Sequence, residues 1–292
     1  MAYNFAKIGF TAKLTAYMRQ FTDIPFAPDV ANLVRAGKAL EDLLRNHALK
    51  PGDLHWYAPI FEARHKSIGA MIRRARAKQV LELAAGLSPR GLALTADPKL
   101  RYVETDLPVS IAEKKALLAA ISRGHRLMPR DNLRVMTADA LRRDDLQAAA
   151  KNFQPGQPLL IVHEGLLQYL SSSETEQVAG NIHELLGQFG GAWITPDFSF
   201  KADAAAISDQ QRHFQRIVAE ATDRTLYNNA FENAEHLREY FRGLGFQVEV
   251  FSQLYLAPNL VSPDRLRLPP ELLDELRPRL RIWSLTRLYP RP

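Results

Sequence analysis

The spacing of apolar positions along the chain changes near residue 78. Before that point apolar residues recur every three or four positions, as on one face of a helix. The pattern predicts one amphipathic helix over residues 29–48, ended by Pro51 and Gly52, and a second helix over residues 58–77. The apolar positions of the first helix are Val30, Leu33, Val34, Leu40, Leu43 and Leu44.

After residue 78, short apolar runs alternate with helical or turn-rich stretches. This alternation is typical of an α/β fold with a doubly wound, mostly parallel sheet that carries helices on both faces. Only a short helical stretch (residues 269–278) separates the last two runs, which leaves an antiparallel end to the sheet open. The seven predicted strands are residues 79–83, 101–105, 133–138, 158–164, 191–198, 246–251 and 282–289.

The chain is expected to form a single domain over residues 1–292, with a helical N-terminal cap (1–77) and a Rossmann-like core (78–292). Its content of 46% hydrophobic and 24% charged residues is ordinary for a soluble globular protein. Cysteine is absent, which excludes disulfides and thiolate metal sites. Because we find neither a secretory signal nor an apolar stretch of about 20 residues, we expect a cytoplasmic protein without a membrane partner.

The net charge of +6 raises the question of a nucleic-acid partner. The basic residues concentrate in residues 64–78, where helical spacing places the apolar residues on one face and the charges outward. We interpret this segment as the solvated face of a packed helix, because no zinc finger, aromatic stacking motif or basic tail accompanies it. We therefore expect no nucleic-acid partner.

Small residues follow the first predicted strand. Ala84, Ala85 and Gly86 keep the turn narrow, so that a ligand can lie against the backbone. Ser88 and Pro89 then have the chemistry of a helix start, with a hydroxyl N-cap followed by a residue that lacks an N–H. The sequence predicts a ligand-binding loop between this strand and the helix after it.

Polar residues also end the next three strands, where ligands bind in open parallel sheets. Glu104 and Asp106 follow the second strand, and a carboxylate there can accept hydrogen bonds from both ribose hydroxyls. Asp139, beside Ala140, is suited to adenine, and Glu164 ends the fourth strand. The dinucleotide motif G-x-G-x-x-G is absent, so a nucleoside without phosphates fits better, and we predict S-adenosyl-L-methionine.

At this point the chain resembles the leucine carboxyl methyltransferase family of S-adenosylmethionine-dependent enzymes, in its bacterial O-methyltransferase branch. The resemblance is carried by "TAKLTAYMRQFTDIPFAPDVA", "ARHKSIGAMIRRARAKQVLELAAGLSPRGL", "YVETDLPVSIAEKK", "TADAL" and "HEGLLQYL", in family order and at family spacing. It covers the chain to about Phe198. Two positions depart from the family, which often has Gly at Ala84 and Asp at Ser88.

The resemblance implies a role for each cofactor-binding residue. Arg64 would pair with the methionine carboxylate, and Gly86 would lie under the amino-acid part of the cofactor, within a loop region that includes Glu82 and Ala84. Either Glu104 or Asp106 would hold the ribose, and Asp139 with Ala140 would hold the adenine. Glu164 would face the methionine amine or the sulfonium, and Arg19 would turn from an N-terminal lid toward the active site.

The chemistry of the acceptor decides whether a base is needed. A carboxylate is already ionised at neutral pH, whereas a hydroxyl or phenol needs a base, for which His163 is the first candidate. Tyr169, Tyr17 and Tyr57 are candidates for the acceptor pocket, and Asp197 either faces the acceptor or caps a loop. No metal is expected, because the His and acidic residues lack ligand spacing.

We predict an O-methyltransferase that acts on a small molecule, with a carboxylate as the first choice of acceptor, and that releases S-adenosyl-L-homocysteine. The alternative is a protein that binds the cofactor without transferring a methyl group. The oligomeric state does not follow from the sequence.

Overall fold

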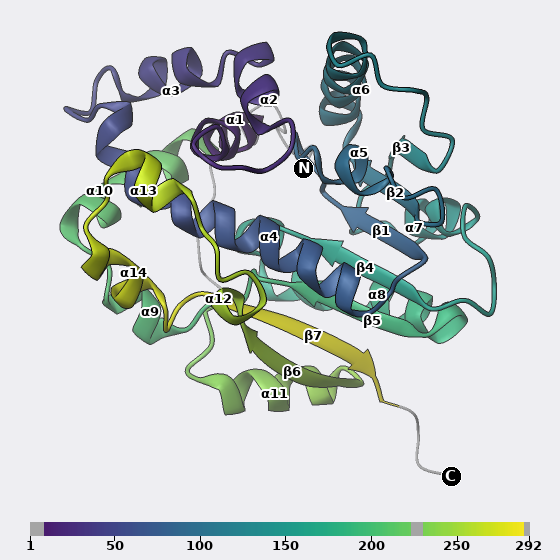
Figure 1. Ribbon diagram of the computed structural model, residues 1–292. Helices are drawn as coiled ribbons and strands as arrows, with labels where there is room; N and C mark the ends of the chain where they lie inside the picture. Colours follow the sequence, from purple (N-terminus) through teal and green to yellow (C-terminus); the bar gives the residue numbers. More distant parts are fainter. Residues whose placement is uncertain (1–8, 223–229, 289–292) are drawn as a thin grey trace.

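The fold is built on one seven-stranded sheet (Figure 1). The computed structural model describes residues 9–222 and 230–288. The strand order is β3-β2-β1-β4-β5-β7-β6, and β7 alone runs antiparallel to its neighbours. The strands are β1 (Gln79–Leu83), β2 (Arg101–Asp106), β3 (Leu133–Thr137), β4 (Leu159–His163), β5 (Gly191–Thr195), β6 (Phe246–Ser252) and β7 (Arg281–Arg287).

All seven predicted strands are present, and the antiparallel end of the sheet is observed as well. Residue 289, the end of the last predicted run, lies outside the described residues. Strands β1 and β4 are buried along their whole length, as expected for continuous apolar runs covered on both faces. The strand order reverses between these two strands, and such a point is where open α/β sheets bind their ligands.

Helices cover both faces of the sheet. The long helix α4 lies along one face (Figure 1), and its Ile68, Met71 and Ile72 belong to the apolar cluster there, as predicted, whereas Ala75 of the predicted apolar side is exposed just after the helix ends. That face carries α4 (Ala58–Arg74), α5 (Arg90–Leu94) and α6 (Pro108–Gly124). The opposite face carries α7 (Arg143–Ala150), α8 (Ser172–Phe189) and α11 (Ala234–Gly243), which form the largest apolar core with the strands.

A separate helical layer lies beyond the carboxyl ends of the central strands (Figure 1). The N-terminal residues supply most of it, and α10, from far later in the chain, packs into the same apolar cluster through Phe214, Ile217 and Val218. The layer contains α1 (Gly9–Arg19), α2 (Ala27–Leu33), α3 (Ala36–Leu44), η2 (Pro51–Tyr57) and α10 (Asp209–Thr222).

The prediction of one helix over residues 29–48 is wrong. Two helices, α2 and α3, occupy this stretch, because Arg35 adopts a left-handed conformation with φ of 51°. The turn allows both short helices to bury apolar residues, among them Val30 on α2 and Leu40 on α3.

Short helices complete the chain. A small apolar cluster joins Ala63 of α4 to Leu276 and Leu280 near the C-terminus. In the part of the chain that the structure describes, no helix has the length and apolarity needed to cross a membrane. The remaining helices are η3 (Leu167–Tyr169), α9 (Lys201–Ala205), α12 (Gln253–Leu256), α13 (Ser262–Leu266) and α14 (Pro270–Leu276).

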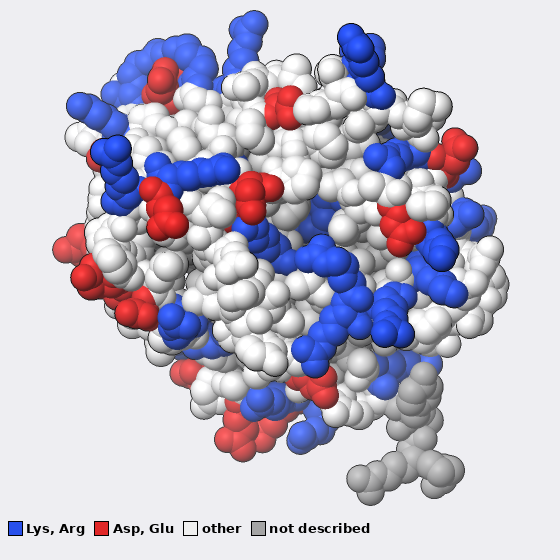
Figure 2. All heavy atoms as spheres, in the orientation of Figure 1, with Lys and Arg blue, Asp and Glu red and all other residues white. Residues whose placement is uncertain are grey.

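Basic side chains gather on the face over α4 (Figure 2). Arg73, Arg74, Arg76 and Lys78 are exposed at and just after the C-terminal end of this helix, as the sequence predicts. They precede β1, so they lie toward the amino-terminal edge of the parallel strands, away from the ligand-binding edge.

Candidate functional site

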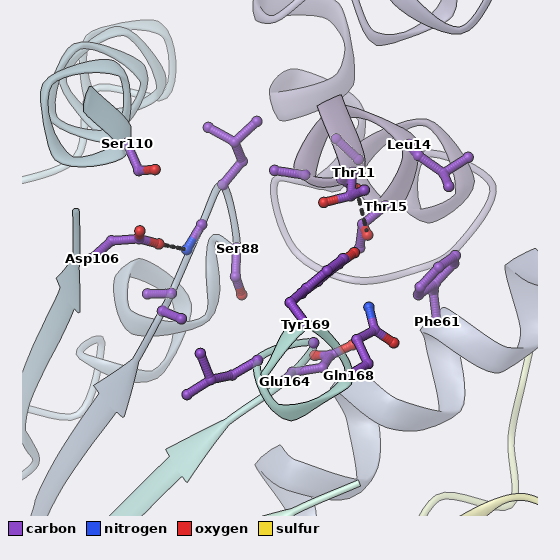
Figure 3. A pocket seen from close by; sticks show the side chains of 18 of the residues that line it. Thr11, Leu14, Thr15, Phe61, Ser88, Asp106, Ser110, Glu164, Gln168 and Tyr169 are labelled. Carbon is purple, nitrogen blue, oxygen red and sulfur yellow. Dashed lines mark hydrogen bonds between the residues drawn. The ribbon is translucent and has the colours of Figure 1, made fainter. Parts of the chain in front are cut away.

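One cavity of about 300 Å³ lies where the helical layer meets the carboxyl ends of β1 to β4 (Figure 3). All of the predicted cofactor-binding residues except Glu104 line it, as do Tyr57 and Tyr169, whereas His163, Tyr17 and Asp197 do not. The lining residues from the strands and the loops after them include Glu82, Ala84, Ala85, Gly86, Asp106, Asp139, Ala140, Glu164 and Tyr169. The lining residues from the surrounding helices include Thr11, Leu14, Thr15, Arg19, Tyr57, Ile60, Phe61, Arg64, Phe214 and Val218.

The loop after β1 forms one wall of the cavity. Ala84 and Gly86 both have left-handed backbones, with φ of 48° and 50°. Glycine adopts this conformation freely, whereas alanine at position 84 does so at a cost. The helix after the loop begins at Arg90 with Pro89 as its N-cap, one residue later than predicted, and the Ser88 hydroxyl accepts a 3.4 Å hydrogen bond from the Arg90 N–H.

Asp106 lines the cavity beside this loop (Figure 3). Its Oδ2 accepts a 2.7 Å hydrogen bond from the Gly86 N–H, and its Oδ1 accepts one of 2.7 Å from the Leu107 N–H. A carboxylate has about four acceptor positions, so Asp106 retains capacity for hydroxyl donors from a ligand.

Glu104, the other candidate from β2, does not reach the cavity. Its side chain is fully buried beneath the loop, with Oε1 3.0 Å from Lys114 Nζ and 3.2 Å from the Gly91 nitrogen. Of the two candidates on this strand, Asp106 lines the cavity and Glu104, two positions earlier, is buried away from it. The structure therefore corrects the inclusion of Glu104 among the ligand-binding residues.

The third strand exit supplies Asp139, Ala140 and Leu141 to the cavity. The Leu141 N–H donates a 2.9 Å hydrogen bond to Asp139 Oδ1, and the Asp139 N–H donates one of 3.0 Å to Asp145 Oδ2. These bonds fix a turn that presents one carboxylate beside apolar atoms, as the sequence predicts for an adenine site.

Glu164, at the end of β4, is held by three arginines. Its Oε1 lies 2.5 Å from Arg19 Nη2 and 3.5 Å from Arg64 Nε, and its Oε2 accepts a 2.7 Å hydrogen bond from Arg90 Nη2. Burial alone raises the pKa of Glu164, but the charges of Arg19, Arg90 and Arg64 outweigh burial and hold this pKa below its ordinary value. Glu164 is therefore an anion fixed at the edge of the cavity.

Arg90 is a functional candidate that the sequence analysis missed. Its guanidinium is buried and bridges Glu82 and Glu164, while the Tyr102 hydroxyl donates a 2.8 Å hydrogen bond to Glu82 Oε2. Arg90 Nη2 also lies 3.3 Å from Nδ1 of His65, whose pKa burial and nearby cations lower well below its ordinary value. The sequence offered one signal for Arg90. It is an arginine directly after the small-residue loop, and the strands before and after it both contain acidic residues near their ends.

His163 is a buried structural residue, which corrects the expectation of a base at this position. Its Nε2 accepts a 2.8 Å hydrogen bond from Trp193 Nε1, and its Nδ1 lies 3.0 Å from Asp197 Oδ2. Both ring nitrogens are thus engaged away from the cavity, which His163 does not line.

Asp197, after β5, caps a loop. Its carboxylate accepts hydrogen bonds of 2.7–3.1 Å from the backbone N–H groups of residues 165–167 and pairs with Arg64. Of the two roles that the sequence left open, the structure shows the loop cap. This cap fixes the segment between Glu164 and Tyr169, both of which line the cavity.

Aromatic rings line the cavity on the side of the helical layer. The Tyr57 ring centroid lies 5.9 Å from that of Phe61 and 5.3 Å from that of Phe214, and Tyr169 points toward α1 (Figure 3). Tyr17 does not line the cavity, and its hydroxyl lies 3.4 Å from His55 Nε2. Within residues 9–222 and 230–288, no group of His, Asp and Glu side chains is placed to hold a metal ion.

Sequence similarity to known proteins identifies the family of this chain. The sequence pattern of leucine carboxyl methyltransferases matches residues 27–183. The chain belongs to the leucine carboxyl methyltransferase family. A protein of Mycobacterium bovis, described by name as an S-adenosyl-L-methionine-dependent methyltransferase, is 30% identical over 227 residues, which are 70% of this chain and 68% of the relative. A second relative so described, from Mycobacterium tuberculosis, is 32% identical over 155 residues, covering 51% of this chain and 49% of its own length.

Solved structures share the fold of this methyltransferase. A structure titled as a methyltransferase from Thermobifida fusca has a TM-score of 0.57 and 18% identity, with 96% of this chain and 94% of that chain covered. A protein from Streptomyces avermitilis has a TM-score of 0.54 and 13% identity, with 96% and 97% covered. The chain is therefore an S-adenosyl-L-methionine-dependent methyltransferase with the α/β fold of such enzymes.

Proposed function

We propose that this methyltransferase forms methyl esters on small carboxylic acids. S-adenosyl-L-methionine supplies an electrophilic methyl carbon on a positively charged sulfur. In the proposed arrangement, Asp106 accepts hydrogen bonds from the ribose, Asp139 and Ala140 hold the adenine, and Glu164 pairs with the methionine amine. The cations for the methionine carboxylate are Arg64 and Arg19, which lie beside Glu164.

The state of Glu164 supports a carboxylate acceptor. Because three arginines stabilise its ionised form, Glu164 is a weak base for a hydroxyl proton. His163 lies outside the cavity. The lining that the structure describes contains no histidine and no lysine. A carboxylate needs no base, since it is ionised at neutral pH. The residues then have to align it with the methyl carbon and exclude water, and alignment alone can lower a barrier by about 7–11 kcal/mol.

The wall of the cavity supports an acceptor with an apolar body. Tyr57, Phe61 and Phe214 pack against one another there, beside Leu14 and Val218. Burial of apolar surface against these residues stabilises a bound acid by about 25 cal/mol per Å² of area removed from water. The aromatic wall and the strand exits line one cavity, so an acid whose body packs on this wall would have its carboxylate near the methyl group.

Labelled methyl transfer tests the proposal. The purified protein is incubated with methyl-labelled cofactor and the small-molecule fraction of a host extract, and the products are treated with mild alkali. A methyl ester releases labelled methanol, whereas a methyl ether keeps its label. We expect most of the label to be volatile after alkali; label that resists alkali would show that the acceptor is not a carboxylate.

Variants connect this labelling to the cavity. We expect Glu164→Gln to lower labelling at least about tenfold, because a charged hydrogen-bond partner contributes roughly 1.5–3 kcal/mol. Glu249→Gln, an exposed position on β6, is the matched control and should label as the unaltered protein does. Equal labelling by both variants would remove Glu164 from the site.

A further inference from the structure

A buried ion pair lies beneath the cofactor loop (residues 84–90). Lys114 of α6 and Glu104 of β2 are both fully buried, with Lys114 Nζ 3.0 Å from Glu104 Oε1. Neither residue lines the cavity, so neither is placed to touch a ligand. Burying two charges costs free energy that an ion pair offsets only with good geometry and further hydrogen bonds, so the further partners of this pair indicate what it does.

Those further partners are one backbone group within the cofactor loop and one in the first turn of α5, directly after it. Lys114 Nζ donates a 3.3 Å hydrogen bond to the Ala85 carbonyl, which also accepts one of 3.1 Å from the Ser88 N–H. Glu104 Oε1 accepts a 3.2 Å hydrogen bond from the Gly91 N–H. A Cβ at Gly91 would lie 2.6 Å from Glu104 Oε1, so only glycine allows this approach.

The cofactor loop begins with unfavourable backbone geometry, directly before the first of these contacts. Ala84 has φ of 48°, a left-handed conformation that an L-residue adopts at a cost, and Ala85 follows it directly. Such geometry persists when the surrounding structure holds it in place. The hydrogen bond from Lys114 to the Ala85 carbonyl restrains the peptide group between Ala85 and Gly86. Asp106 holds the N–H of the same peptide group from the cavity side.

From these contacts we infer that Lys114 and Glu104 are positioning residues, which hold the cofactor loop in its binding conformation through Ala85 and Gly91. The inference concerns cofactor binding and is independent of the identity of the acceptor. According to this inference, the ion pair offsets the conformational cost of alanine at position 84. Where position 84 carries alanine, the left-handed turn needs an external restraint, and with glycine there the restraint would matter less.

The test is a set of dissociation constants for S-adenosyl-L-homocysteine, measured by calorimetry on the full chain. We expect Lys114→Met to weaken binding about tenfold or more, as loss of a charged hydrogen-bond donor implies. Lys115→Met, the exposed neighbour on the same helix, is the control and should leave the dissociation constant unchanged. Wild-type affinity in Lys114→Met would overturn the inference.

A second change separates loop positioning from general support of the fold. Ala84→Gly in the Lys114→Met background should recover a substantial part of the lost affinity, about threefold or more, while the same change alone should have little effect. A merely structural ion pair would show no such coupling, because glycine at position 84 does not repair a distant packing defect. Absence of any recovery would therefore also overturn the inference.

Lys114→Met leaves Glu104 buried without its cation, and this variant is at risk of not folding. The double variant Glu104→Gln/Lys114→Met removes both charges and keeps an amide oxygen for the Gly91 N–H. The same two measurements are made on it, with and without Ala84→Gly. Weakened binding with recovery supports the inference, and unchanged binding or weakening without recovery overturns it.

Discussion

At the scale of a residue, the pKa of a buried carboxylate near the cavity depends on how many cations and N–H donors surround it. For Asp197, burial raises the pKa, but Arg64, His163 and backbone N–H groups outweigh burial and hold the pKa far below its ordinary value. Glu104 has one cation and one N–H, and within the described residues its Oε2 has no partner. Burial therefore prevails over Lys114 and raises the pKa of Glu104 to about 7.

Asp197→Asn tests this difference through the pH dependence of stability. The native pKa of Asp197 lies below its unfolded value of about 3.9, so its contribution is fully present above that value and is lost only as pH falls further. We expect the variant to lose about 3 kcal/mol of unfolding free energy, equally at pH 7.5 and pH 5, because Arg64 and His163 lose an anionic partner. Urea unfolding at both pH values measures this loss. A deficit that shrinks between pH 7.5 and pH 5 would contradict the lowered pKa.

The sequence identifies the acids at the strand exits but not their depth. Glu104 and Asp106 are two positions apart on β2, so their side chains leave the same face of the sheet and no pattern separates them. The docking of α5 and α6 decides that Glu104 is covered and that Asp106 is open to the cavity. Arg90 and Lys114 were missed for a related reason, because their partners lie on other elements and become neighbours only after these pack.

At the scale of elements, all seven strands could be predicted because each contains a short apolar run. The central strands β1 and β4 are fully buried, whereas β3 and β6 lie at the two edges of the sheet and are partly exposed. The helix break at Arg35 could not be predicted, because arginine is not typical of the left-handed conformation and the nearest glycine, Gly37, lies inside α3 rather than at the break. With this left-handed turn at Arg35, Val30 of α2 and Leu40 of α3 are both buried in the helical layer.

Arg35→Gly should therefore stabilise the protein. Glycine adopts the left-handed conformation without a steric cost, and after its greater entropy in the unfolded chain is subtracted we expect a gain of about 0.5–1 kcal/mol. Glu41→Gly, an exposed position inside α3, is the matched control and should cost about 1 kcal/mol. Thermal unfolding of the three proteins measures both effects. A lower midpoint for Arg35→Gly would show that the backbone at this position is not strained.

At the scale of the whole molecule, the cavity lies between two layers that distant parts of the chain build. The sheet supplies the loops of the strand exits, while α1 and α10 supply apolar walls from near the start and from the last third of the chain. An ion pair from α1 to the strand exits joins Arg19 to Glu164, the carboxylate proposed to receive the cofactor amine. Ligand binding at Glu164 should therefore reduce the local opening of α1.

Hydrogen exchange tests this coupling between the layers. At saturating S-adenosyl-L-homocysteine, we expect amides of α1 that exchange by local opening to slow about tenfold, because the ligand fixes Glu164 and packs beside Thr11 and Thr15. Helix α14 lines no part of the cavity and serves as the internal reference, since its local openings should be unchanged. Arg19→Met should abolish the slowing in α1 and preserve it in the cofactor loop. Slowing confined to the cofactor loop in the unaltered protein would show that α1 packs over the cavity without responding to its ligand.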